Sequence, residues 1–179
     1  MLGIKIIVGN IISLVAAVFM CLSATAARRR TVYIFQLIEC GVLMLAQLVF
    51  GYPAAAFALA LGAVRNMLIL LEKYSMPVMV SFVFLILSFA VLTIDGVSVE
   101  ILPIIATLIF TIGSYFARGV VETKIVFILM LVFWSVYSFI IRDFSTAVTN
   151  TVSAILALFA IITHKHADIV GKRRKIKSK

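Results

Sequence analysis

The chain has 179 residues, of which 64% are hydrophobic and 13% are charged, and its mean hydropathy is +1.24. Soluble domains contain far less apolar sequence, so this composition excludes a fold that has water as its main solvent. A net charge of +9 would suggest nucleic acid as the partner of a soluble protein, but in a membrane protein it first indicates topology. A hydrocarbon core of about 30 Å requires about 20 apolar residues per helical crossing, so the chain can supply seven crossings and no separate soluble domain.

The first apolar segment covers residues 6–26. Lys5 alone precedes it and Arg28-Arg29-Arg30 follow it, which predicts a retained helix with its N-terminus outside rather than a cleaved signal peptide. Residues 76–94 contain no charge and form a central segment that inverts the chain. Five further helices are expected at 31–50, 54–71, 99–117, 123–141 and 145–163. The sequence therefore predicts an all-α integral membrane protein with seven transmembrane helices.

The distribution of basic residues predicts the orientation. With the N-terminus outside, thirteen of the sixteen Lys and Arg residues fall in cytoplasmic loops or in the C-terminal tail. This bias follows the positive-inside rule, and it places the C-terminus in the cytoplasm. Six crossings would place either the arginine triplet or the basic tail outside, so we expect seven.

The spacing of landmarks predicts an internal repeat. The basic loop at 28–30 corresponds to the loop at 118–124, and the turn at 51–53 corresponds to 143–145. Three crossings end on the opposite side from where they began, and one further helix brings the chain back. We therefore expect two three-helix bundles in parallel orientation about an axis along the membrane normal. The expected divisions are a first bundle at 1–73, a linker helix at 74–98, a second bundle at 99–166 and a basic cytoplasmic tail at 167–179.

Short motifs lie at particular places in these helices: Gly51-Tyr52-Pro53-Ala54, Arg65 late in the third segment, the stretch Val-Glu-Ile-Leu-Pro-Ile at 99–104, and Trp134 in the sixth. With these motifs the chain resembles the bacterial inner-membrane YgjV family, which implies multi-pass insertion in the inner (cytoplasmic) membrane. Its three-one-three plan is also similar to the SWEET sugar facilitators and the PnuC-type nicotinamide riboside transporters. That similarity implies a solute site between the two bundles.

Two ionisable residues are expected inside the bilayer, where each costs about 2.5 to 3.5 kcal/mol on insertion scales. Glu39 and Arg65 lie about 13 Å and about 9 Å from the cytoplasmic ends of their helices, at about 1.5 Å per residue. We expect them to form an ion pair. The pair could line a solute site, or it could lock two helices together with no contact to a solute. Arg65 could also extend to the cytoplasmic surface.

Polar residues near this pair predict the lining of a solute site. Gln36 lies three residues before Glu39 on the same helical face, and Asn66 follows Arg65. Thr146, Thr149, Asn150 and Ser153 share one face of the seventh helix, as Thr107, Thr111 and Ser114 do in the fifth. Such stripes also serve helix packing, and Trp134 is expected either to stack on a flat ligand or to pack in the core. The substrate-binding candidates are Gln36, Glu39, Arg65, Asn66, Trp134, Ser138 and Asn150.

Other classes of site have little support. His164 and His166 are two residues apart and do not share a helical face, so no metal site is expected. Cys21 and Cys40 lie in apolar segments, where thiols pack as small apolar groups. No cofactor and no nucleic acid is expected. The expected partners are the lipid bilayer, a small polar solute and anionic lipids at the basic tail, and a homo-oligomer is left open.

Two functions remain. No HExxH, GxSxG or P-loop motif occurs, so an enzyme is not expected. The first function is a transporter or facilitator of a small polar metabolite, such as a sugar, a nucleoside or a vitamin. The second is a membrane scaffold or subunit that transports nothing and whose polar residues only lock its helices. Because Arg65 would keep a neighbouring Glu39 ionised, we favour facilitation over proton coupling.

Overall fold

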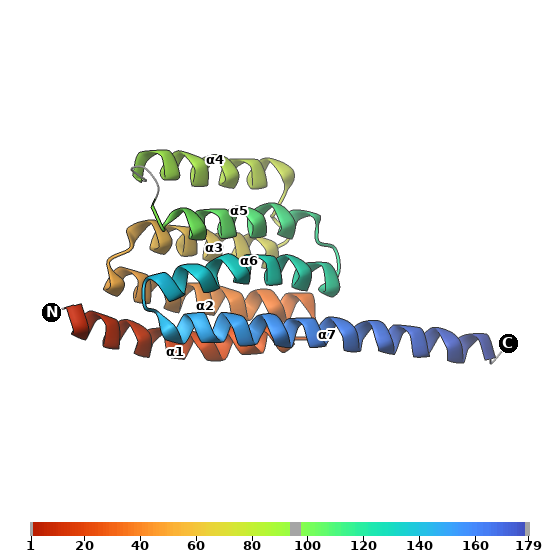
Figure 1. The fold of residues 1–179 in the computed structure, drawn as a ribbon. Coiled ribbons are helices and arrows are strands. Elements are labelled where there is room, and N and C mark those ends of the chain that lie inside the picture. Colours follow the sequence, from red (N-terminus) through yellow and green to blue (C-terminus); the bar gives the residue numbers. More distant parts are fainter. Residues whose placement is uncertain (1, 94–97, 178–179) are drawn as a thin grey trace.

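The computed structural model describes residues 2–93 and 98–177, with side chains described over 3–92 and 98–163. This part of the chain forms seven α-helices and no strand (Figure 1). The predicted all-helical fold with seven helices is confirmed. The helices are α1 (Leu2–Thr25), α2 (Arg29–Phe50), α3 (Pro53–Leu70), α4 (Met76–Thr93), α5 (Ile101–Phe116), α6 (Val120–Ile140) and α7 (Phe144–Lys177).

The outer surface of the helices suits lipid rather than water. Among the described residues, α1, α2, α3, α6 and α7 are long and apolar enough to cross a membrane, whereas the apolar stretches of α4 and α5 are shorter. At about 1.5 Å per residue α5 spans about 24 Å, a mismatch that tilt of its neighbours or local thinning of the bilayer can absorb. Large apolar side chains point outward, among them Phe84 (70% exposed) and Val91 (83% exposed). We conclude that lipid covers these faces.

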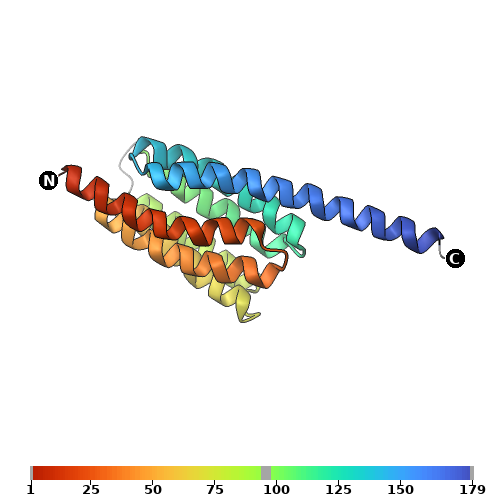
Figure 2. The same cartoon turned by 90° about the horizontal axis from the view of Figure 1, so that it is seen from below.

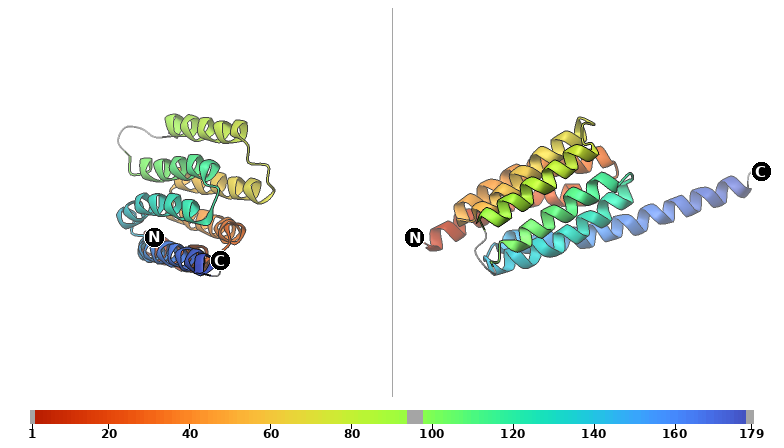
Figure 3. Two further views of the ribbon diagram at one scale, coloured as in Figure 1. Left: turned by 90° about the vertical axis from the view of Figure 1, so that its right-hand side faces the viewer. Right: turned by 90° about the horizontal axis from the view of Figure 1, so that it is seen from above.

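The helices form two facing rows. One row is α1, α2 and α3, and the other is α7, α6 and α5; α1 packs against α7 at one edge and α3 against α5 at the other (Figure 1 and the left view of Figure 3). Helix α4 lies outside the rows and packs mainly on α5. Figure 2 shows α1 and α7 side by side, with the two termini at opposite ends of the bundle. The relation between the rows as a parallel repeat stays a prediction.

The ends of three helices are closed in the same way. Gly51, after α2, has φ +89°, and the N–H of Tyr52 donates to the carbonyl of Gln47. Glu72 and Arg142 hold the equivalent left-handed positions after α3 and α6, with φ of 59° and 64°. This motif satisfies carbonyls that the helix leaves free and reverses the chain within a few residues, so the turns are short.

The last helix is longer than the sequence indicated. We expected it to end at residue 163, but α7 continues to Lys177. The added stretch contains no proline, and Lys and Arg are good helix formers that are favourable near a helix C-terminus. The side chains of His164, His166 and the basic tail lie outside the described residues, as do residues 94–97, where the predicted central segment ends.

Candidate functional site

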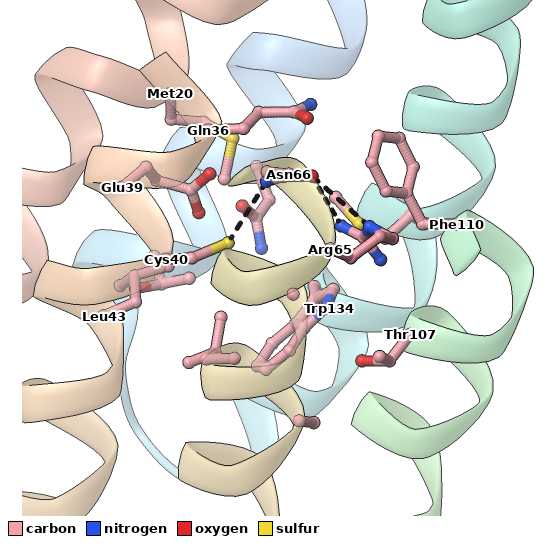
Figure 4. Close-up of a pocket in the computed structure, with 16 residues that line it drawn as sticks. Met20, Gln36, Glu39, Cys40, Leu43, Arg65, Asn66, Thr107, Phe110 and Trp134 are labelled. Carbon is pink, nitrogen blue, oxygen red and sulfur yellow. Dashed lines mark hydrogen bonds between the residues drawn. The ribbon is translucent and has the colours of Figure 1, made fainter. Parts of the chain in front are cut away.

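A cavity lies between the two rows, and every helix except α4 contributes to its lining (Figure 4). The volume available to the centres of water molecules is about 30 Å³. Its polar lining residues are almost completely shielded from the surface. The lining consists of Met20, Gln36, Glu39, Cys40, Leu43, Ala58, Leu59, Gly62, Arg65, Asn66, Thr107, Phe110, Met130, Trp134, Thr146 and Asn150.

The structure brings six of the seven substrate-binding candidates to this cavity: Gln36, Glu39, Arg65, Asn66, Trp134 and Asn150. Ser138 is buried but does not line it. Ser138 follows Trp134 by four residues and is therefore about 6 Å further along the axis of α6. Its carbonyl accepts the N–H of Asp143 at 2.9 Å, which places it at the end of the helix rather than at the cavity.

Arg65 joins the two rows through neutral partners. Its Nε and Nη2 donate to Oδ1 of Asn66 at 3.3 and 3.1 Å, and its Nη1 donates to the hydroxyl of Thr111 on α5 at 3.2 Å. The guanidinium carbon also lies 4.4 Å from the centre of the Phe110 ring. A cation over an aromatic face is attracted by the ring, most strongly where water is excluded. Arg65 is therefore stabilised without a carboxylate.

The predicted ion pair between Glu39 and Arg65 is wrong. Within the described residues no salt bridge joins them, and the hydrogen bonds of Arg65 go to Asn66 and Thr111. Figure 4 shows the reason, since the Asn66 side chain lies between Glu39 on α2 and Arg65 on α3. Asn66 Nδ2 also contacts the sulfur of Cys40 at 3.9 Å. The Glu39 carboxylate thus faces the cavity.

Two amide side chains in the cavity have no hydrogen-bond partner in the described structure. Both polar atoms of Gln36 and both polar atoms of Asn150 are buried and unpaired. An unpaired buried amide costs about 1–3 kcal/mol in proteins. Because one amide comes from each row, a molecule between the rows could satisfy both.

Trp134 forms one wall of the cavity and also packs in the core. Its ring contacts that of Tyr137 edge to face, with centroids 5.6 Å apart, and the Tyr137 hydroxyl donates to Oε1 of Gln47 at 3.0 Å. This chain fixes the indole against the opposite row. Sequence reasoning missed Phe110, although its place three residues after Thr107 puts it on the same helical face.

The polar stripes of α5 and α7 are confirmed as inward faces. Thr107, Thr111 and Ser114 are buried on α5, and Thr146, Asn150 and Ser153 are buried on α7. The hydroxyls of Thr107 and Ser114 donate to carbonyls one turn back in α5, whereas Thr146 Oγ1 has no partner among the described residues. The stripe of α7 is therefore the more open of the two to a ligand.

A comparison with protein families decides the relationship of the chain. The model of the Imp-YgjV family, described as a bacterial inner membrane protein, matches residues 7–168. The chain belongs to this family. No curated protein and no solved structure matches it, so the similarity to SWEET and PnuC-type transporters stays a prediction. The Imp-YgjV family match supports a location in the bacterial inner membrane, in contact with the lipid bilayer, and the direction of the termini stays a prediction.

In this Imp-YgjV protein, polar contacts join the two rows at the end of the bundle nearest the N-terminus. Asn10 on α1 accepts the N–H of Ser145 at 3.0 Å and donates to the carbonyl of Arg142 at 3.1 Å. Ser13 donates to Oδ2 of Asp143 at 2.9 Å. Asp143 is the N-cap of α7, since its Oδ1 accepts the N–H of Thr146 at 3.1 Å. Burial raises the pKa of the Asp143 carboxyl above its ordinary value, and the hydrogen bonds from Thr146 and Ser13 oppose this shift.

A buried lysine joins the two rows at the opposite end. Lys124, in the first turns of α6, is 3% exposed, and its Nζ donates to the carbonyl of Ala24 at the end of α1. A cation is favourable at a helix C-terminus, where carbonyls lack helical partners. The contact joins the two rows at the end where α1 finishes. Contacts between the rows thus lie toward both ends of the bundle, on either side of the cavity.

Proposed function

We propose that this membrane protein moves a small polar solute across the bilayer, and that the solute binds in the cavity between the two rows of helices. The observation that carries the proposal is the pair of buried, unpaired amides, Gln36 and Asn150, in one cavity. Unpaired polar groups in a membrane-spanning helix lower the stability of the protein, because lipid offers them no hydrogen-bond partner. A function that needs these groups explains why they are there.

The lining favours a neutral solute with hydrogen-bond donors and acceptors side by side. Each amide offers one acceptor and two donors, and Trp134 supplies an aromatic wall for a flat or ring-shaped molecule. The cation of Arg65 is already engaged by Asn66, Thr111 and Phe110. Sugars, nucleosides and ring-containing vitamins combine these properties, and the proposal includes no catalytic step.

The size of the cavity suggests how the solute moves. A volume of about 30 Å³ holds one or two water molecules, whereas pockets for small organic ligands measure about 300–1,000 Å³. The contacts at both ends support a closed state between two open ones. In the proposed cycle the rows separate at one end at a time, so that the cavity widens toward one side of the membrane.

A thermal-stability screen of the detergent-purified protein tests this proposal. A ligand that binds only the folded state raises the melting temperature (Tm). Sugars, nucleosides, vitamins and amino acids are tested in turn, and each hit is repeated with Trp134→Ala and Asn150→Ala. We expect a hit that both variants lose, followed by its uptake in proteoliposomes. A hit that survives both substitutions would place binding elsewhere.

The scaffold function makes the opposite prediction. If the polar residues only lock helices, no solute in the library raises the Tm and Asn150→Ala merely destabilises the protein. The network of Arg65 with Asn66 and Thr111 fits either function. The discriminating observation is therefore whether a solute recovers stability through the unpaired amides.

A further inference from the structure

A second, smaller cavity adjoins the first between α1, α2 and α7. The volume available to the centres of water molecules is about 10 Å³, which is space for about one water-sized body and too little for an organic molecule. It shares Glu39, Thr146 and Asn150 with the larger cavity. The lining consists of Ser13, Ala16, Ala17, Met20, Glu39, Leu43, Thr146, Thr149 and Asn150.

All five polar side chains in this lining carry an oxygen with free lone pairs. Thr146 Oγ1 and Asn150 Oδ1 have no hydrogen-bond partner in the described part of the chain, and Glu39 accepts no bond there either. The hydroxyls of Ser13 and Thr149 donate their protons away from the cavity, to Asp143 Oδ2 at 2.9 Å and to the Ser145 carbonyl at 2.6 Å. A hydroxyl that donates its proton elsewhere can still accept a hydrogen bond or coordinate a cation through its oxygen lone pairs.

This set of groups suits a small, hard cation. Carboxylate, hydroxyl and amide oxygens are the ligands that hard cations take. The lining contains one carboxylate, Glu39, which neutralises one positive charge. A divalent ion would leave an uncompensated charge in a low-dielectric site, which is costly.

We infer that the cavity between α1, α2 and α7 binds a sodium ion, coordinated by the oxygens of Glu39, Thr146 and Asn150 with Ser13 and Thr149 in support. Asp143 acts as a positioning residue, because it holds the Ser13 hydroxyl and the start of α7. The ligands come from both rows, so the ion favours the closed arrangement. Binding of the ion does not depend on the proposed transport function.

The test measures the Tm of the full chain, purified in detergent and choline chloride. Sodium chloride then replaces choline chloride at constant ionic strength and pH, with lithium and potassium chloride in parallel. We expect the Tm to rise by several degrees with sodium concentration, as ligand linkage requires. Potassium, which is larger, should have a weaker effect.

Thr146→Val separates ligation from structure. The substitution keeps the shape of the side chain and removes a hydroxyl that lies near the Asp143 carboxyl but makes no hydrogen bond of good geometry, so the sodium-free protein should be about as stable as wild type. We expect the sodium-dependent rise to be lost. Thr107→Val is the matched control, because this buried threonine lines only the larger cavity and should keep the full response. Glu39→Gln should also lose it.

Several results would overturn the site. A rise that is equal for lithium, sodium and potassium would be a non-selective effect of replacing choline, and no rise with any cation would mean that no ion binds. A full sodium response in both Thr146→Val and Glu39→Gln would place the ion elsewhere. Uptake in proteoliposomes is measured separately: sodium stabilisation without any solute uptake would refute the transport function alone, and uptake without sodium stabilisation would refute the ion site alone.

Discussion

Gln36 and Gln47 lie on the same helix and are both buried, yet their surroundings differ. Oε1 of Gln47 accepts the Tyr137 hydroxyl at 3.0 Å, whereas neither polar atom of Gln36 has a partner in the described structure. Removing a bonded amide leaves a buried hydroxyl unpaired, and removing an unbonded one relieves a desolvation cost. This contrast separates groups that serve stability from groups that are available to a ligand.

Gln36→Leu should therefore stabilise the ligand-free protein and abolish solute binding. An apolar side chain of similar length removes an unpaired amide whose burial costs about 1–3 kcal/mol. Thermal unfolding in detergent should show a higher Tm, and a solute that raises the Tm of wild type should no longer do so. Gln47→Leu is the control and should lower the Tm. If both variants lower it equally, Gln36 has a structural role.

The buried carboxyl of Asp143 predicts a pH dependence. Burial raises its folded-state pKa above the unfolded value, so the folded state favours the protonated form. The resulting stability is fully present below the unfolded pKa and is lost as pH rises through the folded pKa. Asp143→Asn remains neutral and keeps a good N-cap. As the pH of a sodium-free buffer rises from acidic to neutral, the Tm of wild type should fall more than the Tm of Asp143→Asn. Parallel curves of Tm against pH would contradict this prediction.

At the scale of single helices, α5 and α6 approach each other closely at Gly113. A Cβ built there would clash with Cγ1 of Val126 and would lie 2.7 Å from its Cγ2. Valine is stiff at χ1 and cannot turn away easily. The contact between Gly113 and Val126 sets the distance between α5 and α6. Trp134 also lies on α6, so this distance influences where Trp134 lies.

Gly113→Ala should consequently destabilise the protein, by about 1–3 kcal/mol for an overpacked contact. The double variant Gly113→Ala with Val126→Ala should recover much of the loss, because the second substitution makes room for the new methyl group. Gly41→Ala is the control, since nothing lies within 4 Å of its Cβ position. Thermal unfolding of wild type, Gly113→Ala, Val126→Ala, the double variant and the control checks this, and additive losses in the double variant would reject the close approach.

Hydropathy was sufficient to predict the helices, because lipid requires long apolar segments with satisfied backbones. The last helix was predicted too short, since hydropathy ends at residue 163 while the backbone of α7 continues through basic residues. Helical periodicity correctly turned Thr107, Thr146 and Asn150 inward. It could not predict that Asn66 would separate Glu39 from Arg65, because that depends on how α2 and α3 pack together.

At the scale of the whole molecule, the contacts at the two ends are of different kinds. Near the N-terminus, Asn10 and Ser13 of α1 bind the start of α7 and its cap. At the other end, Lys124 of α6 caps α1. If the rows rock, weakening one contact should favour opening at that end alone. A scaffold would open at neither end.

The native Cys40 can report such opening, because its sulfur lines the cavity and the residue is only 8% exposed. In a Cys21→Ser background, a membrane-impermeant maleimide should label wild type slowly from both sides of sealed, oriented vesicles, since buried thiols are inert. Asn10→Ala should accelerate labelling from the side where the N-terminus lies, and Lys124→Met from the opposite side. The expected change is at least tenfold if each contact holds about 1.4 kcal/mol of the closed state.

The side of labelling also fixes the orientation of the chain. With the N-terminus outside, Asn10→Ala should react from the periplasmic face and Lys124→Met from the cytoplasmic face. Acceleration from both faces in one variant would indicate unfolding rather than gating, and Tm values of the same samples provide the control. Unchanged labelling in both variants, with normal Tm values, would contradict rocking and favour the scaffold, because a cavity that never opens to either side cannot exchange a solute.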